Sequence, residues 1–209
     1  MLHRTWYLFA QWICQVGCSL AFGLRVVGRR NIPATGSVLI VSNHQSFLDP
    51  VLVGVGLSRE VHHLARETLF KNRLFRGLIV SLNAVAVRRG EADVEGVRRA
   101  IRVLKNGKML LIFPEGTRTR DGGLQRIRPG WTALAARSGA TVVPAVIEGA
   151  HSAWPRTRQF PRCRRIAVAF GEGFRVEERG RGEARRASER LESEWRRLRE
   201  NLRKLLETR

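Results

Sequence analysis

A chain of 209 residues is long enough for one domain with a sizeable core, or for one domain and an anchoring segment, so a second domain is not required. The 38 lysines and arginines against 18 aspartates and glutamates give a net charge of +20, which favours anionic partners: nucleic acid, anionic lipid headgroups or phosphorylated substrates. The three cysteines form no Cys-x-x-Cys pair, which argues against a disulfide framework and a zinc site and favours a reducing compartment.

The first predicted element is an uncharged helix over residues 5–24. It would be about 30 Å long, close to the thickness of a bilayer core, so a membrane-spanning helix is one interpretation. Two glutamines on one face and three aromatic residues that prefer the membrane interface favour a helix lying in that interface: Gln11, Gln15, Trp6, Tyr7 and Trp12. A core helix of a soluble domain is the remaining alternative.

A basic group follows this helix directly, at Arg25, Arg29 and Arg30. Each basic residue close to an anionic leaflet contributes on the order of 1 kcal/mol to membrane binding. An apolar segment and a basic group together supply the two signals that stable attachment usually requires. The sequence therefore predicts an N-terminal membrane-associated segment over residues 1–27.

From residue 28 onward, apolar runs of strand length alternate with helical patterns. This alternation predicts an α/β domain over residues 28–174, with a largely parallel sheet flanked by helices. In such domains functional residues gather where strands end and loops begin. Strands are expected at 38–41, 84–87, 109–113, 141–146 and 166–170, and helices at 50–57, 69–81, 91–105 and 130–137.

The last predicted element, over residues 175–209, is a basic amphipathic helix. Its apolar residues recur at spacings of four and three and form one stripe: Leu191, Trp195, Leu198, Leu202 and Leu205. Docking of this stripe on the protein's own domain is the favoured interpretation. Contact with a membrane or a partner is the alternative.

A polar motif, Ser42–Pro50, follows the strand at 38–41 and contains His44 and Asp49. On one straight helix these two residues would lie about 140° apart, so they can meet only if the chain turns between them. Pro50 suits the first helical position and makes Asp49 the expected N-cap, with Ser46 as the rival cap. Two interpretations stay open: a helix cap beside an incidental histidine, or a carboxylate that orients a histidine to take a proton from a hydroxyl.

A second motif, Phe113–Arg120, follows the strand at 109–113. Glycine at 116 permits close backbone approach, the Thr117 hydroxyl can donate, and the Arg118 guanidinium matches the geometry of a phosphate. Glu115 is unusual in an anion site, so we expect it to position an arginine or a substrate hydroxyl. A solvated, charged turn is the alternative.

The two motifs, in this order and about seventy residues apart, resemble the glycerolipid acyltransferase superfamily, typified by lysophosphatidic acid acyltransferases. The family's N-H-x-x-x-x-D and F-P-E-G-T-R blocks are both complete. Residues 28–33 and 143–146 resemble its lead-in and its fourth block. Residues 65–89 resemble its second block, in which Arg89 matches the substrate-binding arginine. Departures from that block, at Arg66, Arg73 and Asn83, leave the acceptor less defined than the chemistry.

The resemblance implies an O-acyltransferase that moves a fatty acyl group to the free hydroxyl of a lysophospholipid, with 1-acylglycerol-3-phosphate giving phosphatidic acid. Acyl-CoA or acyl carrier protein would be the donor substrate, and neither a cofactor nor a metal is expected. His44, oriented by Asp49, would be the general base, without a covalent acyl-enzyme. The implied substrate-binding residues are Arg89, Glu115, Gly116, Thr117, Arg118 and Lys71.

Membrane phospholipids are the other expected partner, nucleic acid is not expected, and the expected location is the cytoplasmic face of the cell membrane. Acylation of a different lysolipid by the same mechanism is one alternative. A serine hydrolase is disfavoured because the chain has no Gly-x-Ser-x-Gly. A non-catalytic basic module that binds membrane or nucleic acid would account for the charge but has no use for the two motifs.

Overall fold

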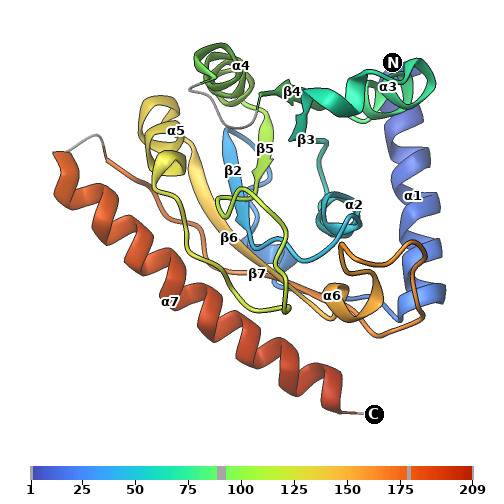
Figure 1. Cartoon of the computed structure of the whole chain (residues 1–209). Helices are drawn as coiled ribbons and strands as arrows, with labels where there is room; N and C mark the ends of the chain where they lie inside the picture. The colour runs from blue at the N-terminus through green and yellow to red at the C-terminus, as the bar shows by residue number, and fades with distance from the viewer. Residues whose placement is uncertain (1, 89–92, 178–179, 209) are drawn as a thin grey trace.

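The computed structural model describes residues 2–88, 93–177 and 180–208 as helices packed on both faces of one sheet (Figure 1). The elements in chain order are α1 (Leu2–Phe22), β1 (Arg25–Val27), the short 3-10 helix η1 (Arg29–Asn31), β2 (Val38–Ser42), α2 (Asp49–Val55), β3 (Val61–Arg66), η2 (Glu67–Phe70), α3 (Arg73–Ser81), β4 (Ala84–Val87), α4 (Val94–Lys105), β5 (Met109–Ile112), α5 (Gly130–Ser138), β6 (Thr141–Glu148), α6 (Ala150–Ala153), β7 (Ala167–Phe170) and α7 (Gly180–Glu207).

The seven strands form one sheet in the order β1-β7-β6-β2-β5-β3-β4. The five strands from β6 to β4 are parallel, whereas β7 runs antiparallel to β6 and pairs in parallel with β1. β2 lies at the centre, and all five of its residues are buried. A parallel strand covered on both faces requires such a continuous apolar run. The predicted α/β class with a mostly parallel sheet is confirmed.

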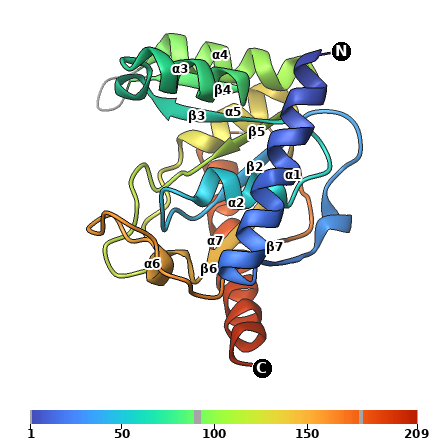
Figure 2. The ribbon, with the colours of Figure 1, turned by 90° about the vertical axis from the view of Figure 1, so that its right-hand side faces the viewer.

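Helices cover the two faces of the sheet in separate groups. Helices α1, α2 and α6 lie against one face, and α4, α5 and α7 lie against the other (Figures 1 and 2). Alternate residues of β2 follow this division, because Val38 and Ile40 pack in the first cluster while Leu39 and Val41 pack in the second. This alternation is the period of two that a strand imposes on its side chains.

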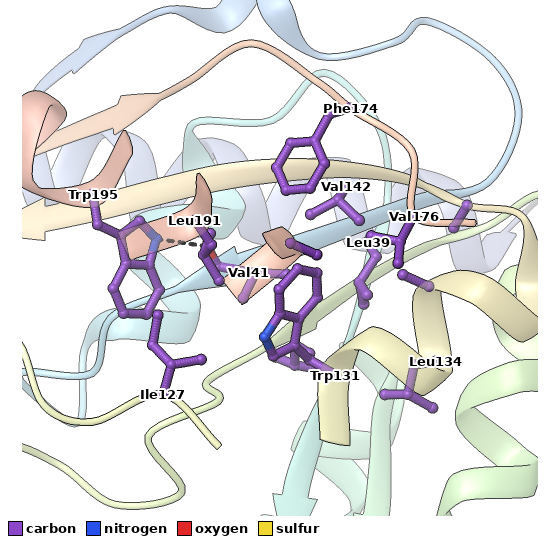
Figure 3. Close-up of a cluster of buried hydrophobic side chains, with 14 of the residues drawn as sticks. Leu39, Val41, Ile127, Trp131, Leu134, Val142, Phe174, Val176, Leu191 and Trp195 are labelled. Carbon is purple, nitrogen blue, oxygen red and sulfur yellow. Dashed lines mark hydrogen bonds between the residues drawn. The ribbon is translucent and has the colours of Figure 1, made fainter. Parts of the chain in front are cut away.

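The long C-terminal helix α7 packs on the sheet through the predicted apolar stripe. Leu191, Trp195, Leu198 and Leu202 are buried, and Leu205 is partly buried against the same cluster. The indole Nε1–H of Trp195 donates to the carbonyl of Val41 at 3.2 Å, at the end of β2 (Figure 3). The favoured interpretation of this helix, docking on its own domain, is the arrangement observed.

Two strands and several boundaries differ from the prediction. β3 was missed because His62 and His63 interrupt its apolar pattern, and burial keeps both imidazoles neutral by lowering their pKa, that of His63 to about 4. β1 was missed because it is a three-residue edge strand.

The helix predicted over 69–81 begins at Arg73, where the Asn72 side chain caps it. The start predicted for α4 lies outside the described residues, and the described helix begins at Val94.

Helix α1 contacts the domain partly through polar groups and leaves large apolar side chains exposed. The Gln11 side chain donates to the carbonyls of Gly54 and Leu57, both at 2.8 Å, and the Tyr7 hydroxyl accepts the Val61 amide at 3.2 Å. Large apolar side chains are exposed along its outer side: Trp6, Phe9, Trp12, Ile13, Val16 and Leu20. Within the described part of the chain, no helix combines the length and hydropathy needed to cross a bilayer.

Candidate active site

The two polar motifs meet because β2 and β5 are adjacent parallel strands. Val41 pairs with Ile112 at their carboxyl ends, so the residues three positions further along, His44 and Glu115, emerge at the same edge of the sheet. The predicted convergence of chemistry at the strand ends is therefore observed. Both residues are buried, with exposed fractions of 8% for His44 and 4% for Glu115.

His44 and Asp49 form a direct pair. The imidazole Nδ1 lies 2.7 Å from Oδ2 of the Asp49 carboxylate, which is fully buried. The same oxygen accepts the backbone N–H groups of Gln45 and Ser46. Because this oxygen already accepts two hydrogens, Nδ1 is the protonated ring nitrogen, and Nε2 carries the free lone pair.

The predicted N-cap role of Asp49 is wrong. Helix α2 begins at Asp49 itself, and the carboxylate points back into the preceding turn instead of toward the helix amides. Pro50 occupies the first turn of the helix, as expected. The turn between His44 and Asp49 therefore depends on the aspartate accepting backbone amides that precede it.

The backbone of His44 is bound on both sides to the second motif. Its N–H donates to Oε2 of Glu115 at 3.1 Å, and its carbonyl accepts the Thr119 N–H at 2.8 Å. The imidazole also stacks on the ring of Phe113, with centroids 4.1 Å apart and an angle of 16° between the planes. These contacts fix both the position and the plane of the imidazole.

Glu115 joins the two motifs from the inside. Its Oε2 accepts the His44 N–H and the side-chain amide of Gln125 at 3.0 Å, and its Oε1 accepts the Gln125 backbone N–H at 3.2 Å. Burial raises the pKa of this carboxyl, and the three hydrogen bonds oppose that rise. Both oxygens thus accept hydrogen bonds from within the protein, and Glu115 holds the two motifs together.

Gly116 allows the second motif to fold into a tight loop. Its φ of 72° lies in the left-handed region, and its N–H donates to the Phe113 carbonyl at 3.0 Å. A Cβ at this position would lie 3.2 Å from the guanidinium carbon of Arg128. The Gln125 side chain closes the loop by donating to the Thr117 carbonyl at 2.9 Å. The Thr117 residue itself is exposed.

Arg118 lies over the first motif. Its guanidinium carbon stands 3.4 Å from the centre of the Phe47 ring, three residues after His44, and Phe47 contacts the indole of Trp154 at 5.8 Å. Phe47 is 54% exposed, so this stack forms part of the accessible surface beside the dyad.

The remaining two predicted substrate-binding residues follow β3 and β4. Lys71 is exposed just after η2, at the edge of the sheet where β2 and β5 also end. Arg89 lies outside the described residues, two positions after the end of β4. In the described part of the chain, no hydrogen bond or ion pair joins Lys71 to His44 or Asp49.

Three polar side chains that the sequence did not single out hold the site in place. Asn43 extends the pairing of β2 with β6, because its carboxamide donates to the Ile147 carbonyl at 3.0 Å and accepts the Ile147 N–H at 2.8 Å. Gln45 donates to the Gly122 carbonyl at 3.0 Å and accepts the His151 N–H at 3.2 Å. Both residues lie inside the first motif, which was the available signal.

Arg199 of α7 is the third polar side chain that holds the site in place. Its guanidinium donates to the same Gly122 carbonyl at 2.6 Å and pairs with Glu148 at 2.7 Å. Arg199 stands four residues after Trp195, beside the apolar stripe of α7, and its side chain is only 16% exposed. The loop that carries the second motif is thus tied to Gln45 and to α7 at one carbonyl.

Comparisons with known proteins agree with this site. A family model described as Acyltransferase matches residues 23–148, a range that includes both motifs. The 1-acyl-sn-glycerol-3-phosphate acyltransferase of Bacillus subtilis is 32% identical over 148 residues, which cover 70% of this chain and 73% of the relative. The enzyme of the same name from Pseudomonas aeruginosa is 28% identical over 180 residues, covering 85% of this chain and 68% of the relative.

The fold agrees as well. The crystal structure of the 1-acyl-sn-glycerophosphate acyltransferase from Thermotoga maritima superposes with a TM-score of 0.80 and 26% identity, over 96% of this chain and 82% of that chain. The matched range, the identity and the shared fold together show that the protein is an enzyme of acyl transfer, and the chain belongs to the acyltransferase family.

Proposed function

We propose that the enzyme transfers a fatty acyl group from a thioester donor, acyl-CoA or acyl carrier protein, to the free hydroxyl of 1-acylglycerol-3-phosphate, giving phosphatidic acid. The observation that carries this proposal is the buried His44–Asp49 pair at 2.7 Å, whose histidine backbone is bonded on both sides to the second motif. The names of the relatives support this acceptor.

The reaction needs a base at the acceptor hydroxyl. The Nε2 lone pair of His44 takes the hydroxyl proton while the hydroxyl oxygen attacks the thioester carbonyl carbon. The tetrahedral intermediate then expels the thiolate, and the imidazolium gives this proton to the thiolate. Asp49 stabilises the imidazolium between these steps, and the products are an ester and a free thiol.

Acceptor recognition falls to the basic residues around the dyad. Arg118, whose guanidinium carbon lies over the Phe47 ring, would bind the phosphate through its guanidinium, and the exposed Thr117 would add a hydroxyl donor. Gly116 shapes this loop, and Lys71 and Arg89 follow strands that end at the same edge of the sheet. Glu115 acts indirectly, through the backbone of His44.

A lysophospholipid acceptor dissolves in a membrane, and α1 has a surface suited to one. The polar groups of Tyr7 and Gln11 face the domain, while Trp12 and Leu20 are 61% and 83% exposed. Indole rings and an exposed apolar side are typical of helices that lie in the membrane interface. These features support a location at the membrane with α1 in the interface, and we propose the cytoplasmic face of the cell membrane as the side.

The test is release of free thiol from acyl-CoA with lysophosphatidic acid as the acceptor. His44→Ala should reduce the rate by about 100-fold or more while binding to vesicles is retained. His3→Ala, which changes an exposed histidine far along α1 from this site, is the matched control. Full activity in His44→Ala would sink the mechanism.

Acceptor choice has its own test. Arg118→Lys keeps a positive charge but loses the planar fork, so it should raise the KM for lysophosphatidic acid more than it lowers kcat. An equal loss toward a lysolipid without a phosphomonoester would argue against contact between Arg118 and the phosphate.

A further inference from the structure

The chain between α6 and β7, residues 154–166, carries five arginines and no acidic residue. Four of the arginines are exposed: Arg156, Arg162, Arg164 and Arg165. None of the five forms an ion pair with an acidic side chain in the described part of the chain. We call this segment the arginine loop. Within the described residues, no acidic side chain neutralises its positive charge.

Hydrogen bonds within the arginine loop hold its conformation. The Arg162 N–H donates to the Ala153 carbonyl at 2.8 Å and closes the base, and the Arg158 N–H donates to the Pro155 carbonyl at 3.1 Å. The indole of Trp154 donates to the Arg158 carbonyl at 3.0 Å and braces the loop from inside. Phe160 lies within the loop and is 70% exposed. An exposed phenylalanine among unpaired arginines suits a surface that is both anionic and apolar.

One end of the arginine loop adjoins the interfacial helix. The Ile166 N–H donates to the Phe22 carbonyl at the end of α1, at 3.1 Å. A Cβ built on Gly23 would lie 3.9 Å from the side chain of Arg165. Figure 2, which looks onto α1, shows the loop after α6 beside the C-terminal end of this helix. The exposed apolar side of α1 and the arginine loop are therefore neighbouring parts of one surface.

The other end adjoins the active site. The Ser46 hydroxyl donates to the Trp154 carbonyl at 2.8 Å, and the Trp154 ring contacts Phe47, on which Arg118 stacks. A group bound by the arginine loop would therefore lie near Phe47 and Arg118, where the proposed function expects the entrance for the acceptor. A bilayer that touched α1 and the loop at once would present its headgroups to that entrance.

We propose that the arginine loop is a docking site for the anionic headgroups of the membrane, with Phe160 inserted between them. It orients the active site toward the leaflet from which the acceptor comes, and in this sense the proposal rests on the proposed function. An acidic carrier protein would satisfy the charges, but the exposed phenylalanine and the contact with α1 favour a lipid surface.

The experiment compares vesicle binding of the full chain and two triple variants. The test variant is Arg156→Gln, Arg162→Gln and Arg164→Gln. The control removes three exposed arginines from the helices on the opposite face of the sheet: Arg98→Gln, Arg102→Gln and Arg137→Gln. The probes are vesicles of phosphatidylcholine alone and vesicles that contain one third phosphatidylglycerol.

Each basic residue near an anionic surface strengthens partitioning by about fivefold. The test variant should therefore bind the anionic vesicles up to about 100-fold more weakly at low salt, with little change on neutral vesicles. Phe160→Ser should weaken binding to both kinds of vesicle. Equal binding of the test and control variants to the anionic vesicles would overturn the proposal.

Two further readouts separate this proposal from the others. In detergent, with dispersed acceptor and acyl-CoA, the test variant should keep the wild-type kcat, because none of its three residues belongs to the catalytic or acceptor site. If vesicle binding is unchanged and only the KM for acyl carrier protein rises, the loop docks a carrier protein and the membrane proposal is wrong. Vesicle binding needs no turnover, so failure of the His44 mechanism would leave it testable.

Discussion

Glu115 offers the sharpest test of how the two motifs depend on each other. Glu115→Gln keeps the size of the side chain but replaces one acceptor oxygen by an amide donor. In one orientation the new NH₂ faces the backbone N–H of Gln125, and in the other it faces the N–H of His44 and the side-chain amide of Gln125. Every orientation therefore leaves at least one buried donor without an acceptor.

The cost follows from this geometry. A buried donor left unpaired costs about 1–3 kcal/mol, and relief by a shift of the chain would displace the His44 backbone. If the loss appears in the transition state, kcat falls by about 5–150-fold. Global stability should change less, because burial raises the pKa of the Glu115 carboxyl and the neutral amide avoids the cost of burying that charge.

The pH dependence of the free energy of unfolding gives an independent test of the Glu115 contact. Because the folded pKa of Glu115 is raised, its contribution to stability is complete below the ordinary pKa of a glutamate and is lost as pH rises through the folded pKa. Glu115→Gln should remove this decline from the free energy of unfolding. Glu95→Gln, at an exposed glutamate on α4, should change neither stability nor kcat by a measurable amount.

The assays are thiol release at saturating substrates and urea unfolding at several pH values. A kcat within twofold of wild type, together with a clear loss of stability, would refute the reasoning. That result would mean that the Glu115 contact supports the loop but not the position of the histidine.

Three other variants test separate parts of the structure. Asp49→Asn keeps the shape but removes the charge that stabilises the His44 imidazolium, so kcat in the thiol assay should fall by about 100-fold or more with a nearly constant acceptor KM. Arg199→Gln removes a donor from the Gly122 carbonyl and should raise acceptor KM by about three- to tenfold without altering the pH profile of kcat; Arg203→Gln, whose partner is only Glu148 at 3.5 Å, should not. His63→Gln should flatten stability between pH 6.5 and 4 in urea unfolding, because the wild-type pKa of about 4 makes stability fall by at most about 3 kcal/mol as pH drops through that range.

The central strands could be predicted because burial on both faces imposes an apolar run on the sequence. Residues 38–41 and 109–113 are such runs: the first lies within β2 and the second contains β5, and both strands are fully buried or nearly so. β3 carries a different pattern, since His62 and His63 are polar residues, and burial in the folded sheet lowers the pKa of both imidazoles. Its existence depends on pairing with β5 and β4, which no local window of sequence contains.

The site divides in the same way. His44 and Asp49 could be proposed from their spacing and motif, but the partner of the His44 backbone could not, because Glu115 lies 71 residues away. Gln125 and Arg199 carry no local signal that marks them, since each bonds to a carbonyl or carboxylate of a distant loop. Long-range hydrogen bonds of this kind are a property of the folded chain.

The Asp49 carboxylate accepts a different set of hydrogen bonds from those that a helix cap would accept. A cap would satisfy amides ahead of it in α2, and the histidine would then be free to rotate. Instead one carboxylate oxygen accepts the amides of Gln45 and Ser46 and the imidazole Nδ1–H together. The Asp49 carboxylate thus both stabilises the turn and orients the His44 imidazole. Removing the Asp49 side chain would therefore disrupt the turn and release the imidazole at the same time. This coupling is why Asp49→Asn, which can still accept the backbone amides through its carbonyl oxygen, is the variant that separates the charge from the fold.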